Sequence, residues 1–120
     1  IPLAIAGIRL ADQTPGLKLV YGTDAVAGAH GRNAEDLVCR VRQAGQRPMD
    51  VLIAATSTAA EAMGLARETG SLTPGLAADL VVLDGNPLQD IGVVGRVTFV
   101  MRGGVVYRHD PTLSENRALR

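Results

Sequence analysis

One short apolar run, residues 17–22 (LKLVYG), most constrains what this chain can fold into. Lys18 is its only charged residue, and Gly22 ends it. A run of this length without polar alternation is typical of a strand covered on both faces, as in a parallel barrel or a doubly wound sheet. The sequence therefore predicts a strand at 17–22, yet the residues around it predict loops and helices and offer it no sheet to join.

Two helices are predicted beside this run. Residues 4–12 repeat apolar side chains at helical spacing, although Gly7 weakens the pattern. In the segment 33–44, Asn33 suits the N-cap and Gly45 suits the residue that ends the helix. One side of this second helix collects Ala34, Leu37, Val38 and Val41.

A third helix is predicted from Pro48, which is favourable at the first helical position. Its expected apolar stripe consists of Met49, Leu52 and Ile53. Residues 56–58 should interrupt it, and the capping-box spacing from Thr58 to Glu61 predicts a new helical turn that ends at Gly64.

The pattern changes to β at Gly70. We expect a short β stretch at residues 71–72 and a strand at 79–84. A further pair of strands, 96–102 and 105–108, should form a hairpin around the two-residue glycine turn 103–104. A tail follows over residues 109–120. The fold class predicted is α/β, with an incomplete βα half and a small antiparallel half that would be marginal alone.

Composition excludes several functional classes. Among 120 residues the net charge is zero and aromatic residues make up 2%, which argues against nucleic-acid binding. No apolar run approaches the length of a membrane span. The single cysteine, Cys39, allows no internal disulfide and is expected to be half-buried. No secretory leader is visible; because the chain begins with Ile1 rather than Met, this only weakly favours the cytoplasm.

The order of motifs resembles the amidohydrolase superfamily, in particular its imidazolonepropionase-like and Xaa-Pro dipeptidase-like group. The matching segments are GLKLVYGTD (16–24), HGRN (30–33), RPMDVLIAATSTAAEAMGL (47–65), GSLTPGLAADLVVLDGNPLQD (70–90) and VTFVMRGGVVYR (97–108). A GTD tripeptide alone would carry no weight. The long segment 70–90 after the 47–65 helix makes the resemblance specific.

The resemblance implies a (β/α)8 barrel with a small composite β-sandwich domain. On this interpretation, residues 1–69 are the C-terminal part of the barrel, and residues 17–22 are its eighth strand. Residues 70–108 are then the C-terminal strands of the sandwich, and 109–120 the tail. The chain would be a C-terminal fragment of a longer enzyme, which explains why neither half is complete.

The resemblance also assigns a role to Asp24. The family's aspartate at the end of the eighth strand ligates a divalent metal, zinc in type, and acts as general base toward the water that the metal activates. From the residues alone, the favoured role of Asp24 is to cap a turn after Gly22, and the family resemblance reverses that preference for the intact enzyme. A catalytic zinc needs about three protein ligands, and only His30 and His109 supply imidazoles here. We therefore expect the metal in the intact parent only, and none in this chain alone.

The loop after Asp24 would line the substrate mouth of the intact enzyme. His30, Arg32 and Asn33 are accordingly predicted to contact substrate. The alternatives are a solvated loop histidine, a solvated arginine and an asparagine that caps the following helix.

Two functions remain open. In the first, the chain is part of a metal-dependent hydrolase of C–N bonds in small amides or dipeptides, inactive by itself and partnered by the missing N-terminal barrel portion. In the second, it is a non-enzymatic module that self-associates through exposed strand edges, because an apolar edge such as 17–22 invites pairing.

Overall fold

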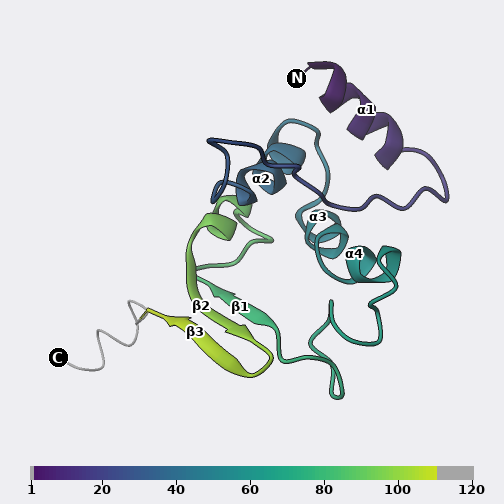
Figure 1. Cartoon of the computed structure of the whole chain (residues 1–120). Coiled ribbons are helices and arrows are strands. Elements are labelled where there is room, and N and C mark those ends of the chain that lie inside the picture. The colour runs from purple at the N-terminus through teal and green to yellow at the C-terminus, as the bar shows by residue number, and fades with distance from the viewer. Residues whose placement is uncertain (1, 111–120) are drawn as a thin grey trace.

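A computed structural model describes residues 2–110 of the chain, which form a group of helices joined to a small antiparallel sheet (Figure 1). The elements in order are α1 (Pro2–Asp12), α2 (Ala34–Arg42), α3 (Pro48–Ala54), α4 (Ser57–Ala62), β1 (Leu80–Leu83), the 3-10 helix η1 (Ile91–Gly95), β2 (Val97–Arg102) and β3 (Val105–His109).

The N-terminal helix α1 confirms the helix expected at 4–12, but it has no buried residue. Leu3 is 87% exposed and Leu10 is 69% exposed. In Figure 1 the helix stands apart from the other elements, joined to them by a long connection. Polar contacts attach it: Arg9 Nε donates to the Ala44 carbonyl oxygen at 3.2 Å. An 11-residue helix held this way lacks the apolar packing that normally stabilises short helices.

The core lies where α2, α3 and η1 meet. Leu37 of α2, Val51 of α3, and Ile91 and Val94 of η1 form the buried cluster, and Val51 is 0% exposed. Partly buried residues around it are Tyr21, Ala34, Val38, Val41, Leu52, Ala55 and Leu83. The apolar side predicted for the second helix is therefore confirmed, and Gly45 follows that helix at φ +82°.

Other helix predictions are wrong in detail. Val51 and Ala54 form the buried face of α3, whereas Met49 is 48% exposed and Ile53 is 41% exposed. Seven residues make about two turns, too few for periodicity to select a face against the pull of the neighbouring elements. Helix α4 begins at Ser57, so the capping box predicted from Thr58 does not form.

The strand predicted at residues 17–22 does not form in the described chain, where this segment has no regular secondary structure. A strand needs a neighbouring backbone to pair with, and the sheet of this structure is built from β1, β2 and β3 alone. The Tyr21 N–H instead donates to the Ala54 carbonyl oxygen at 3.0 Å. The segment leaves Leu17 53% exposed and Val20 38% exposed.

The sheet confirms the antiparallel half of the prediction. Its order is β1-β2-β3, with Val81 opposite Val100 and Met101 opposite Val106. The turn at Gly103 and Gly104 joins β2 to β3, both glycines having positive φ, as the hairpin prediction required. Residues 71–72, expected to be β, form a bend and a loop instead. All of β3 is exposed, so this sheet lacks the cover that a buried face needs.

The 3-10 helix η1 was not predicted. Asp90 caps it, since its Oδ1 accepts the Gly92 N–H at 2.9 Å, and Ile91 and Val94 enter the core. The radius of gyration is 16.0 Å, against about 13–14 Å for a compact domain of this length. The C-terminal tail predicted over 109–120 lies, from residue 111 onward, outside the described residues.

Candidate functional site

The loop of residues 22–33 carries the predicted site residues, between the segment 17–22 and helix α2. Asp24 is exposed and has φ +45°, and it is the one non-glycine residue with positive φ in the range 2–110. Aspartate tolerates the left-handed region better than most residues, but the conformation still costs free energy. Its carboxylate makes no hydrogen bond or ion pair with other described residues.

Asn33 ties the two ends of this loop together. Its Nδ2 donates to Thr23 Oγ1 at 3.0 Å, and its Oδ1 accepts the Gly31 N–H at 3.2 Å. The Tyr21 hydroxyl donates to the Asn33 carbonyl oxygen. Asn33 occupies the N-cap position of α2 but makes no side-chain cap bond. The expectation that its side chain caps the helix is therefore wrong, because the loop uses the same amide.

Arg32 and His30 are further predicted site residues in the loop. Both are exposed, and Arg32 is engaged by Glu35 through two hydrogen bonds of 2.8 and 2.7 Å. The arginine holds the pKa of the Glu35 carboxyl below its ordinary value, chiefly through these hydrogen bonds. A substrate carboxylate would have to compete with Glu35 for this guanidinium.

A cavity of about 280 Å³ opens between the loop and the first turn of α2. Its lining residues are Thr23, Ala25, Ala29, Arg32, Asn33, Glu35 and Asp36. Arg32 and Asn33 thus share one cavity. Asp24 and His30 do not line it, so the described chain does not bring all the predicted site residues to one point.

Behind the loop, Tyr21 packs against a buried arginine. The Arg40 guanidinium lies 5.4 Å from the centre of the Tyr21 ring and donates to the Val20 carbonyl oxygen at 3.3 Å. Arg40 Nε is 3.5 Å from Asp36 Oδ2, an ion pair without hydrogen-bond geometry. Burial, and secondarily Asp36, raise the pKa of Tyr21, whereas Arg40 acts in the opposite direction. The neutral phenol that donates to Asn33 is therefore favoured.

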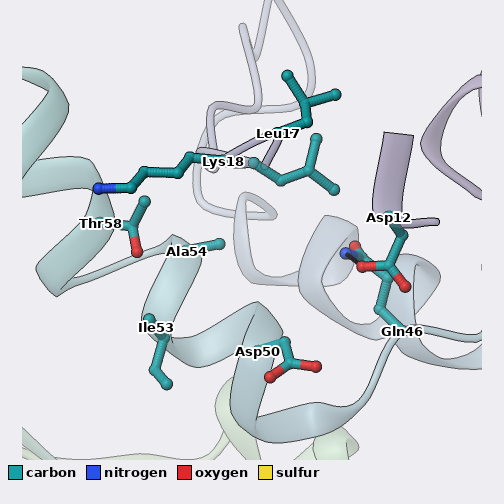
Figure 2. Close-up of a pocket in the computed structure, with 9 residues that line it drawn as sticks. Asp12, Leu17, Lys18, Gln46, Asp50, Ile53, Ala54 and Thr58 are labelled. Atoms are coloured by element: carbon teal, nitrogen blue, oxygen red, sulfur yellow. Dashed lines mark hydrogen bonds between the residues drawn. The ribbon is translucent and has the colours of Figure 1, made fainter. Parts of the chain in front are cut away.

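A second cavity, of about 240 Å³, lies between residues 17–19 and helix α3 (Figure 2). Asp12 and Gln46 lie together on one side of it, joined by a 2.8 Å hydrogen bond from Gln46 Nε2. The Lys18 side chain points to the opposite side, over Thr58, where it pairs with Glu61. None of the predicted site residues lines this cavity, so it is separate from the chemistry assigned to Asp24.

The described residues do not supply enough ligands for the predicted metal site. Within residues 2–110, no group of three or more His, Cys, Asp or Glu side chains lies close enough to hold a metal ion. Asp24 supplies one exposed carboxylate, whereas a catalytic zinc needs about three protein ligands. The described residues do not fit a complete metal site by themselves.

Among residues 2–110, no helix has the length and apolarity needed to cross a membrane.

The sequence matches the amidohydrolase family over residues 4–107. The chain belongs to the amidohydrolase family. It is 36% identical over 97 residues to ochratoxinase of Aspergillus niger, an alignment that covers 78% of this chain and 20% of ochratoxinase. The resemblance stated from its motifs is confirmed.

Solved structures agree with the sequence match. A Xaa-Pro dipeptidase with bound methionine is 33% identical with a TM-score of 0.84, over 89% of this chain and 26% of that one. A prolidase complexed with N-methylphosphonate-L-proline is 32% identical, with a TM-score of 0.78 over 88% of this chain and 26% of the prolidase. The chain therefore has the fold of the corresponding part of an amidohydrolase, and spans 20% of ochratoxinase and 26% of each of these two solved chains.

The sequence predicts Asp24 as a site residue but does not predict the residues whose contacts close its loop. Thr23 and Tyr21 carried no separate prediction, yet both are hydrogen-bonded to Asn33. The only available signal was chemical type. Tyr21 and Thr23 flank Gly22 at the end of the apolar run, and Asn33 follows Thr23 by ten residues.

Proposed function

We propose that this chain contributes Asp24 to the active site of a metal-dependent amidohydrolase that hydrolyses C–N bonds in small amides or dipeptides. The observation that carries the proposal is the placement of Asp24. Asp24 is exposed, its carboxylate is unpaired among the described residues, and its backbone has a left-handed φ of +45° two residues after the apolar segment 17–22. If residues 17–22 are a barrel strand in the intact protein, Asp24 follows its C-terminal end, where barrel enzymes carry catalytic side chains, and this supports the proposal.

In this proposal Asp24 acts as ligand and general base. A divalent metal, zinc in type, would supply Lewis acidity that lowers the pKa of a bound water. The Asp24 carboxylate would serve as the general base, taking a proton from the attacking water and passing it to the leaving amine. The remaining metal ligands would come from the rest of the intact protein, since Asp24 has no partner ligands in the described chain.

The substrate class is inferred from the relatives and from the loop. The similar proteins include a Xaa-Pro dipeptidase and ochratoxinase, which supports a small amide or peptide substrate. We place His30, Arg32 and Asn33 at the substrate mouth because they follow Asp24 on the same exposed loop, and Arg32 and Asn33 line its cavity.

The barrel and sandwich assignment explains the surfaces that this structure leaves uncovered. Residues 17–22 would be the eighth barrel strand, and β1, β2 and β3 part of the small composite domain. The partner proposed is therefore the N-terminal barrel portion, and self-association through residues 17–22 is the alternative. On either account the isolated chain has no hydrolase activity.

The test compares two proteins. One is the 120-residue chain, and the other is the polypeptide from the full reading frame that encodes it, each assayed with a panel of Xaa-Pro dipeptides and N-acyl amides with and without zinc. We expect turnover only from the longer polypeptide with zinc, and a loss of at least about 100-fold in Asp24→Asn. Asp110→Asn, which alters a partly exposed carboxylate beyond β3 that pairs with Arg108, is the control. Full activity of Asp24→Asn would refute the assignment.

A further inference from the structure

The left-handed backbone at Asp24 needs an explanation within the loop. Outside glycine, positive φ costs about 1–2 kcal/mol, and such residues persist only where their surroundings hold them. The neighbours of Asp24 along the chain provide little restraint, because the loop contains Gly22, Gly28 and Gly31. Glycines enlarge the set of conformations open to a loop, so the restraint must come from contacts.

The contacts that close this loop converge on Asn33. Its amide donates to Thr23, the residue before Asp24, and accepts from Gly31 on the returning side. Its carbonyl oxygen receives the Tyr21 hydroxyl. Residues on both sides of Gly22 are thus anchored to the start of α2, which is itself fixed in the core through Leu37.

We propose that Asn33 is a positioning residue for Asp24: it holds Thr23 by a side-chain hydrogen bond and thereby fixes Asp24 in the left-handed conformation in which the residue is exposed. The functional half of this proposal rests on the function proposed above, whereas the conformational half stands on the geometry of the described chain.

The chemistry of the side chain explains why an asparagine serves here. An amide presents a donor and an acceptor from one short side chain, and Asn33 uses both, toward Thr23 and Gly31. An aspartate would keep the acceptor and lose the donor to Thr23. Alanine would lose both bonds. Thr23 contributes only its hydroxyl oxygen, so serine should replace it and valine should not.

The conformation is measured directly by NMR on the 120-residue chain. The intraresidue NOE between the amide and Hα protons is strong at positive φ, because the two protons then lie close together. We expect a strong NOE for Asp24 in the wild type and in Thr23→Ser. In Thr23→Val and Asn33→Ala the ratio of left-handed to other conformers should fall about tenfold, the equivalent of about 1.4 kcal/mol for a lost hydrogen bond.

A matched control separates this effect from general loosening of the loop. Glu35→Gln breaks the ion pair with Arg32 in the same turn without touching the link to Thr23, and it should leave the Asp24 NOE unchanged. Far-UV circular dichroism checks that each variant is folded. If Asn33→Ala unfolds, the comparison of Thr23→Ser with Thr23→Val tests the proposal instead. A weak NOE in the wild type, or an unchanged NOE in Thr23→Val, would overturn the proposal.

Kinetics of the polypeptide from the full reading frame test the functional half. A positioning role predicts that Thr23→Val lowers kcat about tenfold with little change in KM, and that Thr23→Ser restores it. A kcat unchanged in a variant whose Asp24 NOE is lost would refute that half. Complete absence of hydrolysis in the wild type would instead refute the proposed function, and the NMR result would still stand or fall by itself.

Discussion

Replacing Gly70 with alanine should destabilise the junction between the helices and the sheet far more than the same change at Gly75. Both glycines have positive φ, +97° and +94°. They differ in their surroundings. A methyl group at Gly70 would lie 2.5 Å from Ala60 Cβ and 3.1 Å from the Thr56 carbonyl oxygen, whereas nothing lies within 4 Å of a methyl group at Gly75.

The magnitude follows from these two terms. The backbone penalty of a non-glycine residue at positive φ is about 1–2 kcal/mol, and it applies equally to Gly70→Ala and Gly75→Ala. Overpacking adds about 1–3 kcal/mol at Gly70 only, because Ala60 is 5% exposed on a short helix and cannot move away without disturbing α4. We therefore expect a loss of about 2–5 kcal/mol in the free energy of unfolding for Gly70→Ala, and about 1–2 kcal/mol for Gly75→Ala.

Urea unfolding followed by circular dichroism measures both variants under one set of conditions. The difference between them is more informative than either value, since the effect of Gly→Ala on the unfolded chain cancels. Equal destabilisation at the two positions would show that α4 does not pack against Gly70 as described, and would refute the reasoning.

Two further predictions concern the core and its edge. Val51→Ala removes two methyl groups from a fully buried site and should lower the free energy of unfolding, measured in urea, by about 2–3 kcal/mol. Val105 is 57% exposed, so Val105→Ala should lower the same free energy by less than about 0.5 kcal/mol. The Gly92 N–H, and after it Arg42, hold the pKa of Asp90 below its ordinary 3.8. The ionised Asp90 carboxylate therefore stabilises the folded chain above pH 3.8. This stabilisation is lost as the pH falls through the lower pKa that Asp90 has in the folded state. The urea midpoint should therefore fall less steeply with decreasing pH in Asp90→Asn than in the wild type.

Much of the secondary structure was predictable because its signals are local. Pro48 at the first turn of α3, the glycine pair of the hairpin and the apolar side of α2 each depend on a few adjacent residues. The strand at residues 17–22 failed for the opposite reason, since strand formation depends on a partner that local sequence does not contain. The 3-10 helix at 91–95 was missed because its short apolar stretch with two glycines shows no period, and its burial depends on α2.

The candidate site also contains features that the sequence could predict and features that it could not. The order of motifs predicted the amidohydrolase family, which the family match over residues 4–107 confirms, and the role of Asp24 stays a prediction that follows from that family. The hydrogen bond between Thr23 and Asn33 was not predictable, because it spans ten residues of a glycine-containing loop. The sequence predicted that the Asn33 side chain caps α2. In the structure the Asn33 amide makes no cap bond and is hydrogen-bonded to Thr23 and Gly31 of the loop instead. A propensity scale cannot choose between helix capping and loop bonding, because both use the same side-chain amide.

The two parts of the site depend on different contacts. The conformation of Asp24 depends on Thr23, Asn33 and the anchored start of α2, all within the described chain. The uncovered surfaces are elsewhere: α1 exposes Leu3 and Leu10, and residues 17–22 lack a paired strand. Short apolar elements of this kind gain most of their stability from packing. A covering polypeptide would therefore order α1 and residues 17–22, while the loop already holds Asp24 in position. The proposed supply of metal ligands by other residues and the proposed positioning of Asp24 therefore depend on different contacts, which is why the NMR and kinetic measurements can give independent answers.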